Sequence, residues 1–472
     1  MSADQDTFDV VVVGAGLAGL TAALTAAEAG ASVALLEKGA EYGGSSSRSG
    51  GGMVFVGTDL QRQAGVEDSL DALRDDLMRA SQGRAQPEVI DAYVNNQLDT
   101  YRWMAGRGMP FTLEEASTAT TVPRAHLTGP GVAPRHLYEQ VVTDDRITYL
   151  PDTAGRRLVR HDHGRVEGIE VFDGTAERTI TARKGIVLAS GGFGRSVELL
   201  RRFAPQWVDA VKMAGPHNTG DGITMAWALG AGVTDMPYVA ASFGASIAHY
   251  PDLTLDPEEV PILLYPNYLG GIIVNLEGRR FANESLNYKI LSRICADQPG
   301  GAAVQVFDER IFQQSDDRAV PWDFQAAYDA GLVVKTNSIR ELAVALDLDA
   351  DVLDSTVEDY NAAVRAGADP LFGRPIGAGD KLESDQIASP PFYGFPTRSG
   401  LTSTYAGLTV DGDMRVIDVF GEPIAGLFAA GETVGGFHGA GYYSGSALGK
   451  AAVFGRVAGL NVVKDSFPGT GG

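Results

Sequence analysis

The stretch FDVVVVGAGLAGLTAALTAAEAGASVALLEK, residues 8–38, decides how the rest of the chain is interpreted. Residues 9–13 form an almost wholly apolar run of strand length. GAGLAG, at residues 14–19, is a G-x-G-x-x-G pattern at the start of a segment rich in Ala and Leu. Gly30 ends that helical segment, and residues 32–36 have the apolar character of another strand. The stretch therefore predicts a strand, a tight turn, a helix and a second strand.

The glycines of this pattern have separate physical tasks in a dinucleotide site. Gly14 permits the turn, Gly16 lets the backbone approach a pyrophosphate, and Gly19 allows close packing of helix against strand. The pyrophosphate would lie at the N-terminus of the helix. Glu37, after the second strand, is placed to accept hydrogen bonds from a ribose hydroxyl. Together these features predict dinucleotide binding.

Length and charge limit the classes of protein to consider. At 472 residues the chain exceeds the usual single-domain size, so we expect two domains. A formal net charge of −22, from 60 acidic and 38 basic residues, argues against nucleic acid or an anionic membrane as the main partner. No leader pattern precedes Phe8, and no uncharged run approaches the ~20 residues of a membrane span. We therefore expect a soluble, cytoplasmic protein without integral membrane association.

Cysteine and histidine usage bears on metals and redox groups. Cys295 is the only cysteine, which excludes intrachain disulfides and thiolate-held iron–sulfur clusters and suits a reducing compartment. The seven histidines show no H-E-x-x-H or similar pattern, so we expect no metal site. His161 and His163 alternate on a predicted exposed strand, and we expect a structural role for them.

The Gly/Ser run GGSSSRSGGG, residues 43–52, follows the second strand directly. Alone it would suit a flexible linker, but in this position it can lie along a cofactor and offer backbone N–H donors. Residues 67–109 have the periodicity of two surface helices, and residues 185–193 and 426–432 read as further buried strands that end at glycines.

Composition shifts toward aromatic, proline and charged residues between 236 and 399. We expect this segment to be a second domain inserted into the first, which would comprise residues 1–235 and 400–472. The predicted fold class is α/β, with a Rossmann-like domain, in which helices flank a parallel sheet, and an inserted α+β domain.

Several motifs follow the first turn in a fixed order: the Gly/Ser run, a glycine turn at 189–194, NTGDG at 218–222, NLEGRRFANE at 275–284, AAGE at 429–432 and HGAG at 438–441. This order spans essentially the whole chain and resembles the fumarate reductase/succinate dehydrogenase flavoprotein superfamily. The resemblance implies FAD as the cofactor, and it implies that the inserted domain is a catalytic cap that closes over the isoalloxazine ring.

The resemblance also implies a set of cofactor-binding residues: Gly14, Gly16, Gly19, Glu37, Lys38, Gly44, Ser45, Ser46, Gly51, Gly52, Asp221, Glu432, Ser446 and Leu448. The first glycines would hold the pyrophosphate, Glu37 would bind the adenosine ribose, and the later residues would contact the ribityl chain and the ring. Arg279 and Arg280, in the shared NLEGRRFANE motif, would hold the cap together rather than touch substrate.

Three positions depart from the fumarate reductases of this superfamily. Tyr288 stands where they have a proton-delivering arginine, Tyr442 stands where they have an arginine that clamps a substrate carboxylate, and residues 402–407 lack their histidine. Burying a dicarboxylate without paired cations is costly, which disfavours a fumarate-like substrate. The tyrosines instead look like those of the 3-ketosteroid dehydrogenases, especially those that desaturate the 4,5 bond, whose catalytic pattern Tyr288, Tyr442 and Ser444 match.

This second resemblance implies an FAD-dependent dehydrogenase that desaturates the α,β carbon–carbon bond of a cyclic ketone, with a 3-oxosteroid favoured. Tyr288 would remove a proton, aided by Tyr442 and Ser444 because a free tyrosine has a pKa of ~10, and flavin N5 would accept the hydride. No second dinucleotide fingerprint follows, so we expect a quinone, protein or dye-like electron acceptor rather than NAD.

Three alternatives stay open at this stage. A smaller alicyclic ketone such as an oxocyclohexanecarboxylate would need one cation, for which Arg48, Arg124 and Arg398 are candidates. An enoate reductase would run in the opposite direction, and a flavin-binding protein would have only incidental redox activity. Tyr288 and Tyr443 could also be packing residues. The aromatic residues that could either line an apolar pocket or belong to the core are Phe55, Tyr238, Phe243 and Tyr405.

Overall fold

The computed structural model describes residues 6–114, 122–160, 164–254, 261–317, 320–377 and 385–465. The chain forms two compact units. The first comprises residues 1–204, 214–240 and 403–472, and the second comprises residues 205–213 and 241–402. His161, His163 and the tail from residue 466 lie outside the described residues.

The first unit is built on the predicted strand, turn, helix and strand: β1 (Thr7–Val13), α1 (Leu17–Glu28) and β2 (Val33–Leu36). The other strands of this sheet are β6 (Ile147–Leu150), β7 (Ala154–Arg160), β8 (Val166–Phe172), β9 (Glu177–Leu188), β18 (Arg415–Ile417) and β19 (Pro423–Ala429). Their order is β18-β19-β9-β1-β2-β6, with β8 paired to β9 and β7 to β8. Strands β19, β9, β1, β2 and β6 run parallel, so their carboxyl ends meet at one edge of the sheet.

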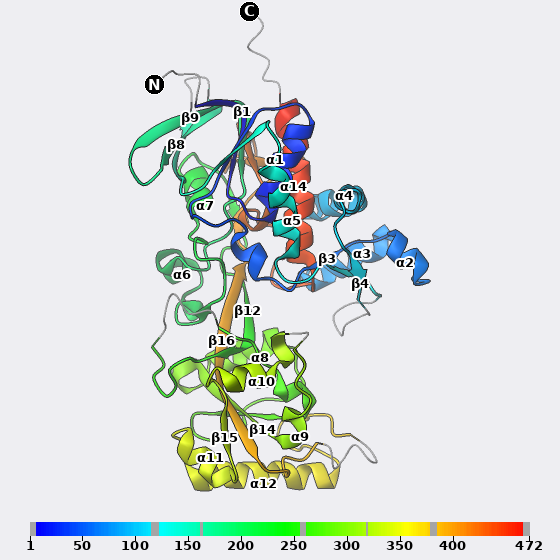
Figure 1. Cartoon of the computed structure of the whole chain (residues 1–472), viewed down its shortest axis with the longest axis vertical. Helices are drawn as coiled ribbons and strands as arrows, with labels where there is room; N and C mark the ends of the chain where they lie inside the picture. The colour runs from blue at the N-terminus through cyan, green and yellow to red at the C-terminus, as the bar shows by residue number, and fades with distance from the viewer. Residues whose placement is uncertain are drawn as a thin grey trace, which may run out of the picture. The chain divides into compact units, whose positions relative to one another are not determined.

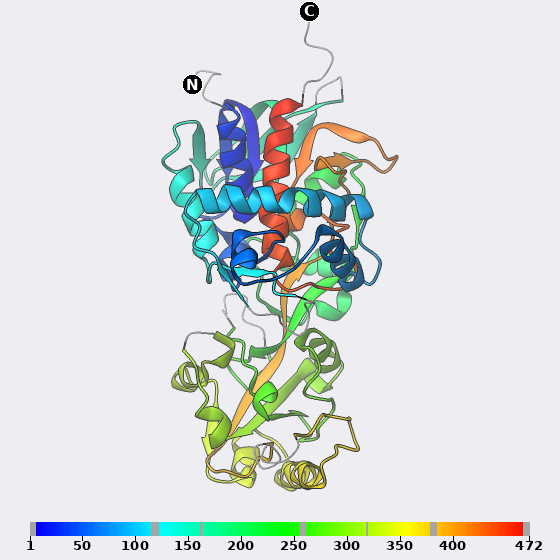
Figure 2. The ribbon, with the colours of Figure 1, turned by 90° about the vertical axis from the view of Figure 1, so that its right-hand side faces the viewer.

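Two helices lie side by side along this sheet, α1 and α14 (Ser446–Lys464), and α4 (Pro87–Gly106) crosses them (Figures 1 and 2). Glycines make the approach possible: a Cβ on Gly455 would lie 2.3 Å from the Ala18 carbonyl oxygen, and one on Gly459 would lie 2.5 Å from that of Ala22. The expectation of two surface helices in 67–109 is only partly right. α4 buries one face, with Tyr93 fully buried, because it packs on α14.

The remaining elements of the first unit are short: η1 (Gly44–Arg48), β3 (Gly52–Val54), α2 (Asp59–Gln63), α3 (Leu70–Ala80), β4 (Thr112–Leu113), β5 (Ala125–Leu127), α5 (Val132–Val141), α6 (Val197–Phe203), α7 (Asp221–Trp227), β11 (Val233–Thr234), β17 (Gly407–Leu408) and η6 (Gly431–Thr433). Strands β3, β5 and β4 form a small antiparallel sheet, and β11 pairs with β17.

The second unit contains a six-stranded sheet of β10 (Val211–Lys212), β12 (Val239–Ser246), β13 (Ile272–Asn275), β14 (Ala302–Asp308), β15 (Val334–Thr336) and β16 (Phe392–Thr404). Its helices are η2 (Pro205–Trp207), η3 (Pro266–Leu269), α8 (Tyr288–Ala296), η4 (Pro299–Gly301), α9 (Glu309–Phe312), η5 (Val320–Trp322), α10 (Phe324–Asp329), α11 (Ile339–Ala345) and α12 (Ala350–Ala366). Apolar residues of α11, α12, β13 and β14 share one core cluster.

A buried ion network ties the second unit together. The Arg280 guanidinium contacts Glu284 at 2.7 Å and Asp369 at 2.9 Å, and both carboxylates are fully buried. This confirms the structural role expected for Arg280. Arg279 differs, because its side chain is exposed.

Within the described parts of the chain, no helix combines the length and apolar character needed to cross a membrane. The same residues contain no group of three or more histidine, cysteine, aspartate or glutamate side chains arranged for a metal ion.

Candidate functional site

The turn after β1 requires glycine at two positions. Gly14 has a φ of +103°, and a Cβ there would lie 2.5 Å from the Ala189 carbonyl oxygen. A Cβ on Gly19 would lie 1.8 Å from the Gly14 carbonyl oxygen. Helix α1 begins after Gly16 with no side-chain cap from that residue and no acidic residue in its first turn. This helix end therefore suits an anionic group such as a pyrophosphate.

The Gly/Ser loop lies against the start of α1. The Gly43 N–H donates to the Ala15 carbonyl oxygen at 2.9 Å, and the Ser46 hydroxyl accepts from the Leu17 N–H at 3.2 Å. An added Cβ on Gly44 would meet nothing within 4 Å, so its backbone is open to a ligand. At the far end of the loop, Gly51 has a φ of +86° and is closely covered by the Gly129 backbone.

Glu37 and Lys38 follow β2 and have different partners. The buried Glu37 carboxylate accepts from the Ala15 N–H at 2.9 Å and the Gly39 N–H at 3.0 Å, which leaves lone pairs that can accept a ribose hydroxyl. The Lys38 ammonium forms an ion pair with Asp221 at 2.8 Å. Lys38 and Asp221, both expected at the cofactor, are thus brought together.

A cavity of about 630 Å³ opens beside Asp221. Gly155, Thr219, Met225 and Trp227 also line it. Its volume lies in the range of ligand-binding pockets, but Glu37 and the glycines of the first turn do not line it.

Asn218 connects two other expected cofactor residues. Its amide Nδ2 donates to Glu432 Oε2 at 2.8 Å and lies 3.4 Å from the Ser45 hydroxyl, and Glu432 Oε1 accepts from the Thr404 N–H at 2.7 Å. Burial raises the pKa of Glu432. Lys450 is also buried, which lowers its pKa to about 8.

Helix α14 begins at Ser446, after Gly445 with a φ of +80°, and its first turn has no acidic residue. The Ser446 hydroxyl donates to the Tyr443 carbonyl oxygen at 2.6 Å and lies 2.9 Å from His438 Nε2. Leu448 is buried in the following turn. Gly52 lies next to this helix start, since its added Cβ would be 3.8 Å from Gly445 Cα.

Tyr442 belongs to a group of three rings. Its ring is parallel to that of Tyr405, with centroids 6.3 Å apart, and lies 5.5 Å from the His438 ring. Tyr405 is buried, whereas Tyr442 and Ser444 are half-buried. Phe55 and Phe243 are fully buried and belong to the core.

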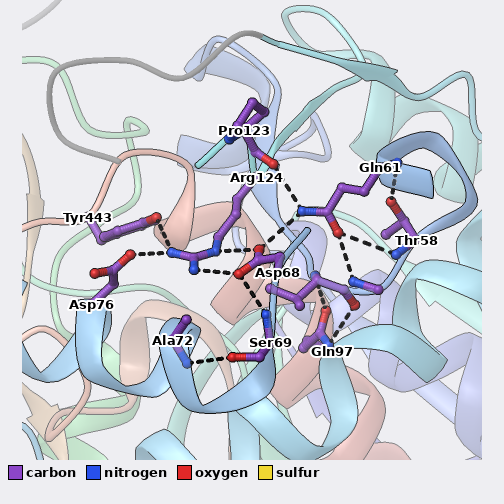
Figure 3. A network of polar contacts seen from close by, with 12 residues as sticks. Thr58, Gln61, Asp68, Ser69, Ala72, Asp76, Gln97, Pro123, Arg124 and Tyr443 are labelled. Atoms are coloured by element: carbon purple, nitrogen blue, oxygen red, sulfur yellow. Dashed lines mark hydrogen bonds and ion pairs between the residues drawn. The ribbon is translucent and has the colours of Figure 1, made fainter. Parts of the chain in front are cut away.

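Tyr443 points instead into a buried polar network (Figure 3). Its hydroxyl accepts from Arg124 Nη1 at 3.0 Å. Arg124 also donates to both oxygens of Asp68 at 2.6 Å and contacts Asp76. Burial acts to lower the pKa of Arg124, but the bonds to Asp68 and Tyr443 outweigh it and raise the pKa. Arg124 is therefore committed to protein partners, which is a correction to its expected availability for a substrate carboxylate.

Arg398 and Arg48, the other candidate cations, differ in accessibility. Arg398 is buried and donates to the carbonyl oxygens of Leu253 at 3.0 Å and Gly300 at 3.2 Å. Arg48 is exposed.

Tyr288 is the first residue of α8 in the second unit. Its ring stacks on Tyr265 with centroids 5.6 Å apart, and burial raises its pKa. The ammonium of Lys289 lies 5.1 Å from the Tyr288 ring centroid and donates to the Ser242 hydroxyl at 2.9 Å. Burial lowers the pKa of Lys289 to about 7.

Sequence reasoning missed three parts of this arrangement. Asn218 was visible within NTGDG but was given no role. Lys289 directly follows a candidate catalytic tyrosine, and that adjacency was the available signal. The ion pairs of Arg124 with Asp68 and Asp76 join separate segments and have no sequence signal.

The family described as FAD binding domain matches residues 9–448. The chain therefore belongs to this family, within the fumarate reductase/succinate dehydrogenase flavoprotein superfamily, and its cofactor is FAD. The start of α1, with no acidic residue in its first turn, and the exposed Gly44 of the Gly/Ser loop fit this cofactor. The chain is an FAD-dependent oxidoreductase.

Two curated relatives cover nearly the whole chain. It is 31% identical to the probable fumarate reductase Ifc3 of Shewanella frigidimarina, over 98% of this chain and 75% of that protein. It is 29% identical to the 4-oxocyclohexanecarboxylate 2-dehydrogenase of Sinomonas cyclohexanicum, over 97% of this chain and 93% of that protein.

Two solved structures are similar throughout. An open conformation of a flavocytochrome c3 fumarate reductase has a TM-score of 0.86 and 29% identity, over 98% of this chain and 78% of that one. The 3-ketosteroid-Δ4-(5α)-dehydrogenase of Rhodococcus jostii RHA1 has a TM-score of 0.73 and 27% identity, over 97% of both chains.

Proposed function

We propose that this protein is an FAD-dependent dehydrogenase that introduces a carbon–carbon double bond next to the carbonyl group of a cyclic ketone. The observation that carries the proposal is the environment of Tyr442. Its neighbours are the rings of Tyr405 and His438, and the guanidinium of Arg124, which contacts the adjacent Tyr443, is already paired with carboxylates. A dicarboxylate would meet tyrosine hydroxyl groups where it needs cations.

Two of the relatives support this class of reaction without fixing the substrate. The oxocyclohexanecarboxylate dehydrogenase matches this chain over almost its full length, and the ketosteroid dehydrogenase matches in both length and fold. The fumarate reductase relative is slightly more similar in sequence. An enoate reductase is therefore the second candidate.

A 3-oxosteroid is the favoured substrate because it needs no cation in the site. A smaller ketone with one carboxylate stays the nearest variant, supported by the Sinomonas relative. Of the three arginines considered for that carboxylate, Arg124 and Arg398 are engaged by protein groups, which leaves the exposed Arg48.

In this proposal Tyr288 accepts the α proton, aided by hydrogen bonds from Tyr442 and Ser444, and backbone N–H groups of residues 441–445 hold the ketone oxygen. Because burial raises the pKa of Tyr288, the tyrosine needs help to lose its own proton. FAD supplies the hydride acceptor. We further propose a quinone or similar external electron acceptor and a cytoplasmic location.

Anaerobic titration tests the proposal. The purified yellow protein should bleach when a 3-oxosteroid is added, and 4-oxocyclohexanecarboxylate tests the smaller variant. If no ketone bleaches the protein but a reduced dye and an unsaturated acid turn over, the enoate reductase is correct.

Tyr288→Phe should abolish turnover and leave the yellow colour, and retained turnover would exclude Tyr288 as the proton acceptor.

A further inference from the structure

We propose that Arg124 and Tyr443 are positioning residues that hold Tyr442 and Ser444 in the reactive geometry, although neither takes part in the chemistry. The inference rests on the proposed function for the roles of Tyr442 and Ser444. It concerns the loop of residues 439–445 that precedes α14.

Both the side chain and the backbone of Tyr443 anchor the loop. Its hydroxyl accepts from Arg124 at 3.0 Å, and its carbonyl oxygen accepts from the Ser446 hydroxyl at 2.6 Å and the Ser446 N–H at 3.0 Å. Tyr443 is 3% exposed, whereas the residues on either side of it are half-buried. The middle residue therefore acts as the anchor, and its neighbours Tyr442 and Ser444 stay accessible.

Arg124 is itself held in one orientation. Asp68 accepts hydrogen bonds from Arg124 Nε and Nη2, each at 2.6 Å, and Asp76, on α3, pairs with Arg124 Nη1 (Figure 3). Gln61 adds a bond to Asp68 at 3.2 Å. A planar guanidinium held in this bidentate manner has little freedom to turn, so the direction of its bond to Tyr443 is fixed.

The C-terminal end of α3 supports the same loop through the backbone. The Ala440 N–H donates to the Ser81 carbonyl oxygen at 3.2 Å, and a Cβ on Gly441 would lie 2.0 Å from the Ala80 carbonyl oxygen. Side chain and backbone contacts thus join the loop to one platform, formed by α3 and Arg124.

Tyr443→Phe tests the inference, because it removes only the hydroxyl that Arg124 holds. We expect kcat to fall on the order of ten- to a hundred-fold with KM nearly unchanged and the flavin retained, since small misplacements of catalytic groups have effects of this size. Hydrogen–deuterium exchange of the peptide 439–449 should become faster. Tyr101→Phe is the matched control: Tyr101 is also buried, and it loses one hydrogen bond, to Asp59 at 2.6 Å.

The results separate this inference from the proposed function. If wild-type protein oxidises no ketone, the proposed function fails, and kcat is then measured for whichever reaction turns over the flavin. If Tyr443→Phe keeps wild-type kcat, or if Tyr101→Phe loses as much, the positioning role is overturned whatever the substrate is. Unchanged exchange in peptide 439–449 would overturn it as well.

Discussion

Single glycines set how closely backbone segments approach at the start of α1. Gly19→Ala would place a methyl group 1.8 Å from the Gly14 carbonyl oxygen, so the turn must deform. We expect this variant to lose bound flavin, measured as the ratio of absorbance at the flavin band to that at the protein band. Gly106→Ala, at the end of α4, has nothing within 4 Å of the added group and should keep its flavin.

The partly buried Lys289 makes stability depend on pH. The pKa of Lys289 is lowered to about 7, while an unfolded lysine titrates near ~10.4, so between these values the unfolded chain binds more protons. The cost of burying Lys289 is therefore full below about pH 7 and disappears as the pH rises toward ~10. Lys289→Met should be more resistant to urea than wild type at neutral pH and lose that advantage at higher pH.

The control for this measurement is Lys464→Met, which changes an exposed lysine at the end of α14. Its unfolding midpoint should follow that of wild type at every pH. If both variants change the unfolding midpoint equally at every pH, the Lys289 ammonium does not destabilise the fold.

The contacts of a single residue could be predicted from the sequence where its partners lie near it in the chain. Gly14 and Gly19 lie in one continuous motif, so the turn at Gly14 and the close packing at Gly19 could be expected. The approach of Gly14 to Ala189, which lies far along the chain, could not. Arg124 could not be assigned, because its partners come from segments before and after it and no periodic pattern links them. Its charge suggested a substrate anion, but two internal carboxylates already neutralise it.

Arg279 and Arg280 are adjacent in the sequence, but only Arg280 is buried, so their replacement should change stability by different amounts. Arg280→Met leaves the buried carboxylates of Glu284 and Asp369 without their main cation, and we expect a loss of about 3–5 kcal/mol in the free energy of unfolding. Arg279→Met, one position earlier and exposed, should change it by about 0.5 kcal/mol or less. Urea unfolding followed by tryptophan fluorescence checks both, and equal losses would contradict the role of the network.

At the scale of elements, strands and helices with strong local patterns were predicted and their neighbours were not. The apolar runs before GAGLAG and after Gly30 form β1 and β2, as predicted, because these two paired strands lie close together in the sequence. The burial of α4 was missed because its pattern of charges is typical of a surface, while its apolar face contacts a helix near the other end of the sequence.

Binding of the cofactor should be measurable on the whole molecule. FAD that binds only the folded chain raises its stability by about 3 kcal/mol at about 100 times Kd. Titration of flavin-free protein should therefore raise its melting temperature with FAD concentration. Because we expect Glu37 and the start of α1 to bind the adenosine diphosphate half, ADP should raise it partly and FMN much less. A larger effect of FMN than of ADP would contradict this assignment.

The contact of α1 with α14 joins a helix made early in translation to one made late. At about 5–20 residues per second, the ribosome needs on the order of tens of seconds to pass from one to the other. During that interval the nascent chain carries a nucleotide-binding turn whose covering helix does not yet exist. Loading of the yellow cofactor is therefore a late event in biogenesis, and chains stalled before residue 446 should emerge colourless.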